Sequence, residues 1–277
     1  MNTLHINGVD LACEERGHGE PLVLVHGAVA DFRSWETQVT QFATHYRVIA
    51  YSRRWHYPNS LGTSGARYTL EVHIADLIEL LRHCGPAHLV GHSYGAAICA
   101  MMALQRPDLV RSLVLAEPSL LSLLRSNPAG ATTLAQVIAA TTQVLTRVHQ
   151  VQNESALRDY LEIILGPRGF ERVPPRARAV MLENLHTLEP MLNGMNSAPP
   201  FTAEDAANLT APTLLMDGEQ SPALFRVVIE ELERSLPNAQ RITLPGVSHG
   251  LHLENPRAFN RAALDFLVPT ALEPLAC

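Results

Sequence analysis

The sequence predicts an α/β fold in which a mostly parallel sheet is covered by helices. Short apolar runs, each ending in Gly, Pro or a polar residue, recur along the chain with helical patterns between them. The runs are residues 21–27, 46–52, 87–93, 111–118, 212–218 and 239–246. Near-continuous apolar runs of this length are typical of strands buried on both faces of a parallel sheet. The alternation of such strands with helices indicates the α/β class.

Helix and turn signals fill the segments between these runs. Residues 69–85 carry apolar side chains at helical spacing and stop at Gly85 before a proline, and residues 221–238 run from a Ser-Pro start to a proline near their end. Residues 5–17 indicate instead an antiparallel pair of strands that turns at Asn7-Gly8.

One region interrupts the alternation of strands and helices. From residue 119 to residue 208, helical patterns follow one another without a strand, separated by Gly, Pro and Asn. These helical segments are residues 129–151, 154–166 and 175–194. We therefore predict a core domain made of residues 1–118 and 209–277, with residues 119–208 inserted as a helical unit over the sheet.

The composition is that of an ordinary globular protein. The chain has 277 residues, of which 47% are hydrophobic and 17% charged, and its formal net charge is -6. Because no block of Lys or Arg is present, we expect no nucleic-acid partner. The N-terminus lacks the pattern of a signal peptide and no apolar stretch is long enough to span a membrane. We expect a cytoplasmic monomer or homodimer without a membrane partner.

The cysteines and histidines give no metal-binding spacing. Cys13, Cys84, Cys99 and Cys277 are scattered, which favours reduced structural thiols. His249 and His252 lie close together, but no third ligand is evident near them. We therefore expect neither a metal site nor an organic cofactor.

The segment Gly91-His92-Ser93-Tyr94-Gly95 lies between a predicted strand and a predicted helix. A Gly-x-Ser-x-Gly pattern at a strand-to-helix turn is typical of a nucleophile elbow, in which strained backbone presents the Ser hydroxyl and the glycines leave room for the turn. The five-letter pattern alone recurs by chance, but a strand before it and a helix after it make it specific. Ser93 is therefore the candidate nucleophile.

Three further segments resemble the α/β-hydrolase superfamily, and the resemblance covers nearly the whole chain. "LVLVHGAVADFRSW" is similar to the family's His-Gly oxyanion loop, "YSRRWHYPNS" lies where the family has its strand-4 loop, and "PGVSHGLHLENP" resembles the loop that carries the histidine. The resemblance implies Ser93 as nucleophile, His249 as base and the helices of residues 118–208 as a cap.

The chemistry of a Ser nucleophile supports this reading. A Ser hydroxyl needs an imidazole to take its proton and later to return it to the leaving group. His249 follows a predicted strand and suits that role, whereas His252, three residues on, is interpreted as lining the pocket or structural. By position, the backbone N–H groups of Tyr94 and Ala28 should stabilise the oxyanion. His26 and His92 are interpreted as structural.

The position of the acid that supports the histidine departs from the usual pattern. Most members of the family carry an Asp in the loop after residues 212–218, which corresponds to Ser221 here. Glu117, at the end of a neighbouring strand, is favoured as its replacement because the ends of parallel strands share one crevice, and some ester- and lactone-cleaving relatives are similar in this respect. Glu219 is the alternative acid, and Asp217 is a weaker candidate.

The resemblance implies a serine hydrolase that cleaves a carboxylic ester or a lactone of a small, largely apolar substrate. Two alternatives, a C–C bond hydrolase and a cofactor-free perhydrolase, would use the same Ser nucleophile. A third alternative, from a different functional class, is a weakly catalytic small-molecule receptor on the same fold.

The segment after the second predicted run, residues 46–52, carries further candidates. Trp55, His56 and Tyr57 are possible substrate contacts, and Arg53 or Arg54 could hold a carboxylate or a lactone oxygen. Ion pairing by the arginines and packing by the rings are equally good explanations.

Overall fold

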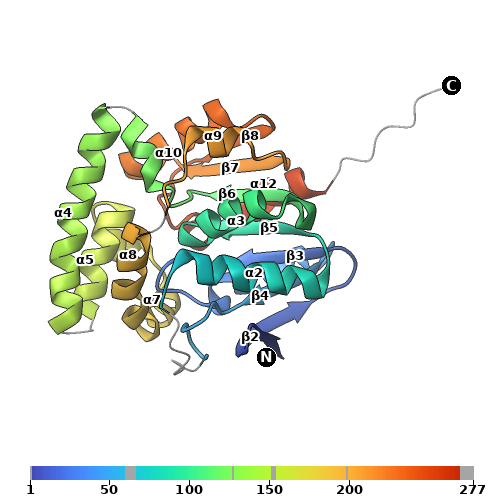
Figure 1. Ribbon diagram of the computed structural model, residues 1–277. Helices are drawn as coiled ribbons and strands as arrows, with labels where there is room; N and C mark the ends of the chain where they lie inside the picture. The colour runs from blue at the N-terminus through green and yellow to red at the C-terminus, as the bar shows by residue number, and fades with distance from the viewer. Residues whose placement is uncertain (1, 60–66, 127, 151–153, 198, 269–277) are drawn as a thin grey trace.

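The structure, a computed structural model, describes residues 2–59, 67–126, 128–150, 154–197 and 199–268. The described residues form an eight-stranded sheet in the order β1-β2-β4-β3-β5-β6-β7-β8 (Figure 1). The strands are β1 (Asn2–Ile6), β2 (Val9–Arg16), β3 (Pro21–Val25), β4 (Arg47–Tyr51), β5 (Ala87–His92), β6 (Val110–Ala116), β7 (Thr213–Gly218) and β8 (Ala239–Leu244).

The sheet is parallel from β4 to β8, whereas β2 pairs antiparallel with both β1 and β4. Each predicted strand is present. The N-terminal pair turns at Asn7 and Gly8, whose φ angles are 46° and 75°. The predicted α/β class with a mostly parallel sheet is confirmed.

The expectation that every apolar run is buried on both faces is wrong for the last one. Residues 239–246 contain β8, which is one of the two edge strands of the sheet. Leu244 is its buried residue, while Gln240, Ile242 and Thr243 are exposed. An edge strand has a neighbour on one side only, so its apolar content reflects strand propensity more than burial.

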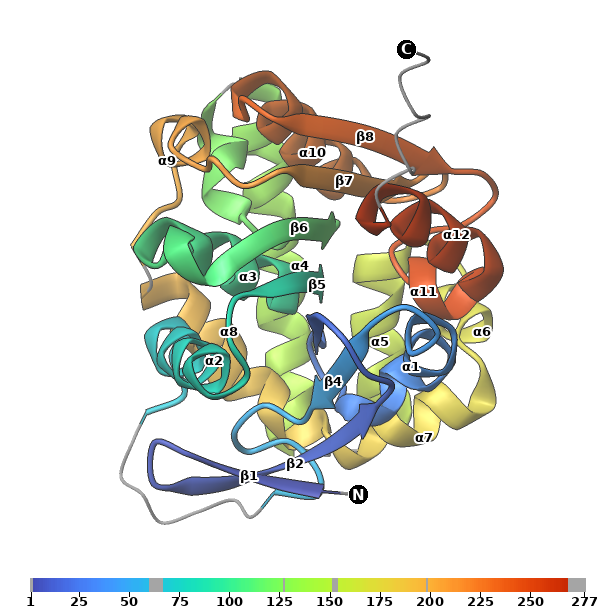
Figure 2. The same cartoon turned by 90° about the vertical axis from the view of Figure 1, so that its right-hand side faces the viewer.

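Helices cover both faces of the sheet (Figure 2). One face carries α2 (Leu70–Cys84), α3 (Tyr94–Gln105) and α10 (Ala223–Ser235), and the other carries α1 (Glu36–Phe42) and α12 (Pro256–Leu267). Successive strand residues alternate between the two cores, so that Val23 and Val25 join the first and Leu22 and Leu24 the second.

Between β6 and β7 the described residues form helices and no strand. They are η3 (Leu121–Ser126), α4 (Pro128–Gln150), α5 (Glu154–Leu165), α6 (Gly169–Arg172), α7 (Pro175–Glu183), η4 (Leu185–Thr187), α8 (Leu188–Ser197) and α9 (Ala203–Ala207). Figure 1 shows α4, α5, α7 and α8 as a layer beyond the end of the sheet toward which the parallel strands point. None of the described helices is long and apolar enough to cross a membrane.

The helical pattern of residues 175–194 is broken in the structure at Asn184, which separates α7 from η4 and α8. The buried Asn184 amide donates to an Asp31 carboxylate oxygen at 2.7 Å, and its oxygen accepts the Tyr57 N–H at 2.8 Å. The Asn184 side chain thus bonds to segments outside the helix at the residue directly after α7.

A buried ion pair joins the loop after β4 to α2. The Arg54 guanidinium donates to both carboxylate oxygens of Asp76, at 2.9 and 2.7 Å, and both residues are buried. The two-bond geometry and the lack of solvent make this pair sensitive to loss of either partner.

We expect Asp76→Asn to lower the free energy of unfolding by about 3–5 kcal/mol, because Arg54 would keep a buried charge without a counter-charge. Urea denaturation measures the change. Glu79→Gln is the matched control on the same helix, since Glu79 pairs with Arg82 at the surface, and it should cost less than about 1 kcal/mol. Equal losses for the two variants would contradict the prediction.

Candidate active site

Ser93 lies at the turn between β5 and α3, with φ 53° and ψ -117°. This strained backbone is possible because the flanking glycines have no side chain. A Cβ on Gly95 would lie 2.1 Å from the Val25 carbonyl oxygen, and one on Gly91 would lie 2.6 Å from the Cα of Ala96. The chain therefore makes the sharp turn that the Gly-x-Ser-x-Gly pattern predicts.

The structure brings Ser93, His249 and Glu117 into one line of hydrogen bonds. Nε2 of His249 lies 3.0 Å from Oγ of Ser93, and Nδ1 of His249 lies 2.6 Å from Oε2 of Glu117. In this arrangement Nδ1–H donates to the carboxylate, and Nε2 accepts the Ser93 hydroxyl proton. Ser93 follows β5, Glu117 follows β6, and His249 follows β8, so the carboxyl edge of the sheet positions all three.

Glu117 is fully buried and adopts a positive φ of 43°. Its Oε1 accepts the Gly218 N–H at 2.7 Å and the Ser221 hydroxyl at 2.5 Å. Burial raises the pKa of Glu117 to about 7, and these two hydrogen bonds oppose that rise because they stabilise the charged form. Ser221, at the position of the usual Asp, therefore contacts the carboxylate that the sequence analysis favoured in its place.

The other two candidate acids are held elsewhere. Glu219 is exposed and accepts the Gly246 N–H at 2.8 Å. Asp217 is buried, but it pairs with Arg241 at 2.8 Å and accepts the Thr243 hydroxyl at 2.9 Å. Of the three candidate carboxylates, the structure places Glu117 against His249.

The His249 ring is held on both sides. Phe225 stacks on it with ring centroids 3.6 Å apart and planes 8° from parallel, and Nε2–H of His92 donates to the His249 carbonyl at 2.7 Å. Burial lowers the pKa of His249 and that of His92 to about 3. The His249 imidazole is therefore neutral near pH 7, which is the state that a general base requires.

Ala28 and Tyr94, the predicted oxyanion donors, both lie at Ser93. Tyr94 is the first residue of α3, so its N–H has no acceptor within the helix. Ala28 borders the same cavities as Ser93. Ser119, which the sequence analysis did not consider, places its Oγ 3.0 Å from Oγ of Ser93. Its place two residues after Glu117 is the signal that could have found it.

Two cavities meet at Ser93. The larger has a volume of about 420 Å³ and extends past His92, His249 and His252 toward α5 and α7. The smaller has a volume of about 50 Å³ and lies on the Tyr94 side. Most of its remaining walls are apolar, including Leu121, Ile163, Met191, Leu192, Leu224 and Phe225, and Ser119, Thr141 and Tyr160 also border it.

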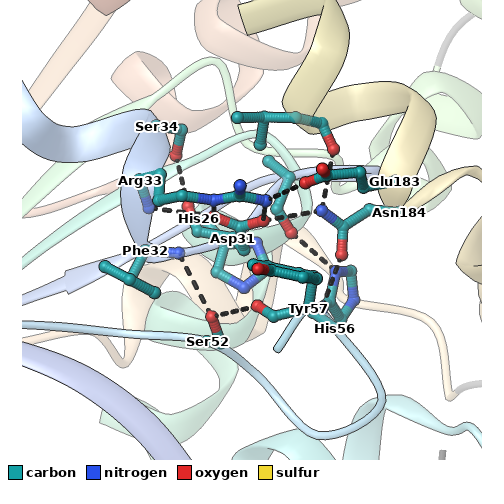
Figure 3. Close-up of polar contacts among 12 residues, drawn as sticks. His26, Asp31, Phe32, Arg33, Ser34, Ser52, His56, Tyr57, Glu183 and Asn184 are labelled. Carbon is teal, nitrogen blue, oxygen red and sulfur yellow. Dashed lines mark hydrogen bonds and ion pairs between the residues drawn. The ribbon is translucent and has the colours of Figure 1, made fainter. Parts of the chain in front are cut away.

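Trp55, His56 and Tyr57, the possible substrate contacts, border neither of these two cavities. The Trp55 ring stacks on Tyr68. The buried His56 ring bonds to the Ala30 carbonyl at 2.6 Å, and Tyr57 lies under the Arg33 guanidinium (Figure 3). These contacts are the loop packing that the sequence analysis gives as the alternative role of the rings.

The described residues were also compared with the ligand sets of metal centres. Among the residues that the structure describes, no group of three His, Cys, Asp or Glu side chains could hold a metal ion. Cys13, Cys84 and Cys99 are free thiols, and Cys277 lies outside the described residues.

Comparisons with known proteins show what the chain as a whole is similar to. The family model described as "Alpha/beta hydrolase family" matches residues 22–262. The chain is 23% identical over 270 residues to (E)-2-((N-methylformamido)methylene)succinate hydrolase of Acinetobacter baylyi, covering 92% of this chain and 93% of that protein. It is 28% identical over 257 residues to the sn-1-specific diacylglycerol lipase of Mus musculus, covering 89% and 80%.

A solved structure shares the fold. The thermophilic esterase of Thermogutta terrifontis superimposes with a TM-score of 0.78 at 22% identity, over 96% of this chain and 97% of that one. The family model spans most of the sequence, including the elbow and the loop of His249. This chain therefore belongs to the alpha/beta hydrolase family.

Proposed function

We propose that this protein is a serine hydrolase that cleaves a carboxylic ester or a lactone through a Ser93 acyl-enzyme. The observation that carries the proposal is the continuous line of hydrogen bonds from Ser93 through His249 to Glu117, at 3.0 and 2.6 Å. A neutral imidazole between a Ser hydroxyl and a buried carboxylate is the arrangement that nucleophilic acyl transfer needs.

The roles follow from the direction of each hydrogen bond. Ser93 Oγ attacks the carbonyl carbon while its proton passes to Nε2 of His249, and the carbonyl electrons become an oxyanion facing the N–H groups of Ala28 and Tyr94. Glu117 stabilises the imidazolium through Nδ1–H. His249 then returns the proton to the leaving alcohol, and it activates the water that releases the acid.

The two cavities favour an arrangement in which the acyl group and the leaving group of the substrate bind in different cavities. The leaving group must reach Nε2 of His249 to be protonated, and the larger cavity is the one that His249 borders. The smaller cavity, on the Tyr94 side, is then the acyl site. Its volume of about 50 Å³ gives room for roughly three to five heavy atoms. A short apolar acyl group is therefore the substrate class that fits, and the ester-cleaving lipase among the relatives supports ester chemistry.

We expect Ser93→Ala and His249→Ala each to lower kcat by at least about 10⁴-fold, and Glu117→Gln by on the order of 10⁴-fold, because each removes a member of a unit that acts together. Hydrolysis of a p-nitrophenyl ester measures the effect. Glu219→Gln is the control acid and should stay within about threefold of wild type. The reverse order of the two glutamate variants would contradict the assignment of Glu117.

Labelling separates turnover from ligand binding alone. We expect a fluorophosphonate to modify Ser93 in the wild-type protein and to leave Ser93→Ala unmodified. A protein that hydrolyses none of the esters and lactones tested and resists the label would be a small-molecule receptor on this fold, and the enzyme proposal would fail.

We expect Ser221→Ala to shift the acidic limb of the pH profile of kcat/KM to higher pH. Burial already raises the pKa of Glu117 to about 7, and the Ser221 hydroxyl lowers it. Activity needs the ionised carboxylate, so a higher pKa removes activity near pH 6–7 and preserves it near pH 9. Ser221→Thr is the matched control, because threonine keeps a hydroxyl that can donate to Glu117, and it should leave the acidic limb near its wild-type position. An equal loss at both pH values would show that Ser221 acts through packing instead.

We expect kcat/KM to be highest for acyl chains of two to four carbons, to rise about fourfold per methylene that fits, and to fall for octanoate. A p-nitrophenyl ester series measures this preference. Leu192→Ala, which enlarges the smaller cavity, should extend the preference to longer chains, whereas Val180→Ala, in the larger cavity, should leave it unchanged. A wild-type optimum at octanoate would refute the division of the two cavities.

A further inference from the structure

Arg53 is a buried cation, and none of its hydrogen-bond partners among the described residues is a carboxylate. Arg53 is 1% exposed, and it lies two residues after the end of β4. Nη2 donates to the Gly27 carbonyl at 2.9 Å, Nε donates to the His26 carbonyl at 3.3 Å, and Nη1 donates to the Tyr68 hydroxyl at 3.0 Å and approaches Nε2 of His73 at 3.3 Å. The neighbouring Arg54, in contrast, is neutralised by Asp76. A buried charge without a counter-charge is costly and calls for a physical reason.

The two carbonyls that Arg53 binds belong to the loop that carries Ala28. The Gly27 carbonyl and the Ala28 N–H are parts of one peptide unit, and in a planar trans peptide the C=O and N–H point in opposite directions. A donor that fixes the Gly27 oxygen therefore also fixes the direction of the Ala28 N–H. Nδ1 of His26 lies 2.9 Å from the same oxygen, and Nε2 of His26 accepts the Arg53 N–H at 3.0 Å.

Arg53 also contacts the residue that carries the second oxyanion donor. Its guanidinium carbon lies 4.9 Å from the centroid of the Tyr94 ring, a cation–π distance. One buried cation thus contacts both the Gly27–Ala28 segment, which follows β3, and the Tyr94 ring, which follows β5.

The histidine rings around Arg53 carry no charge that adds to or cancels the charge of its guanidinium. Burial lowers the pKa of His26, His56 and His73 well below the usual histidine value, and the charge of Arg53 lowers it further. These imidazoles are neutral, so Arg53 is the fixed charge of the cluster. In such a water-poor setting, a cation at the Gly27 carbonyl draws electron density of the peptide unit toward that oxygen. The Ala28 N–H at the other end of the unit then becomes a stronger donor to a negatively charged acceptor.

We propose that Arg53 is a positioning residue for the oxyanion hole: it holds the Gly27–Ala28 peptide so that the Ala28 N–H faces Ser93, and its charge strengthens that donor. The proposal rests on the function proposed above. It assigns to Arg53 a contribution made in the transition state, when the oxyanion forms, and little contribution to the binding of the uncharged ester.

The test compares Arg53→Gln with Arg54→Gln, adjacent buried arginines with different partners. We expect Arg53→Gln to lower kcat by roughly tenfold to a hundredfold, less than the 10²–10³-fold loss typical for an oxyanion donor itself, with KM within about threefold. The rate of Ser93 phosphonylation by a fluorophosphonate should fall in parallel, since that reaction also develops an oxyanion. Arg54→Gln should lower the melting temperature and keep kcat when assayed where it is folded.

Arg53→Lys covers the case in which Arg53→Gln does not fold. Lysine keeps the charge but lacks the fork that binds the two carbonyls and the Tyr68 hydroxyl, so kcat should lie between those of wild type and the glutamine variant. An unchanged kcat in either Arg53 variant, a change confined to KM, or an equal kcat loss in Arg54→Gln would overturn the inference. Failure of the wild-type protein both to hydrolyse esters and to react with the fluorophosphonate would instead overturn the proposed function, and the inference with it.

Discussion

The buried carboxylate of Glu117 is the group on which the arrangement of the site depends. A carboxylate removed from water prefers to be protonated, and a protonated Glu117 could not stabilise a charged His249. The structure counters this tendency with the Gly218 N–H and the Ser221 hydroxyl on one oxygen and His249 on the other. These partners come from the last residue of β7 and from the loops after β7 and β8, so the charge state of one side chain depends on the packing of three strand ends.

The same dependence explains how the acid can lie after β6 while the usual position after β7 holds a serine. The two positions face each other across one crevice, because Ser221 Oγ lies 2.5 Å from Oε1 of Glu117. An Asp at position 221 would set a second carboxylate against Glu117, and two such charges out of water repel one another. A hydroxyl donor at 221 supports an acid at 117, so the residues at the two positions are physically coupled.

What could be predicted from the sequence was mainly what depends on neighbouring residues. The apolar runs located the strands, and Gly91 and Gly95 around Ser93 identified the turn, because both signals are local. Glu117 was found only indirectly, through the serine at position 221. The stacking of Phe225 on His249, the donor role of Ser221 and the helix break at Asn184 could not be predicted, since each depends on a contact between segments far apart in the sequence.

The loop that carries Ala28 is fixed from two sides, which connects the helical layer to the site. Arg53 holds its start from within the core. At its end, the buried Asp31 binds Arg33 and the Asn184 amide, and Glu183 completes the cluster by pairing with Arg33 (Figure 3). Moving Asn184 away from this loop would leave its buried amide without partners and would remove one donor from Asp31. The free-energy cost of leaving buried polar groups unpaired is larger than that of losing hydrogen bonds at the surface. Asn184 is therefore a buried polar contact between the end of α7 and the loop that carries Ala28.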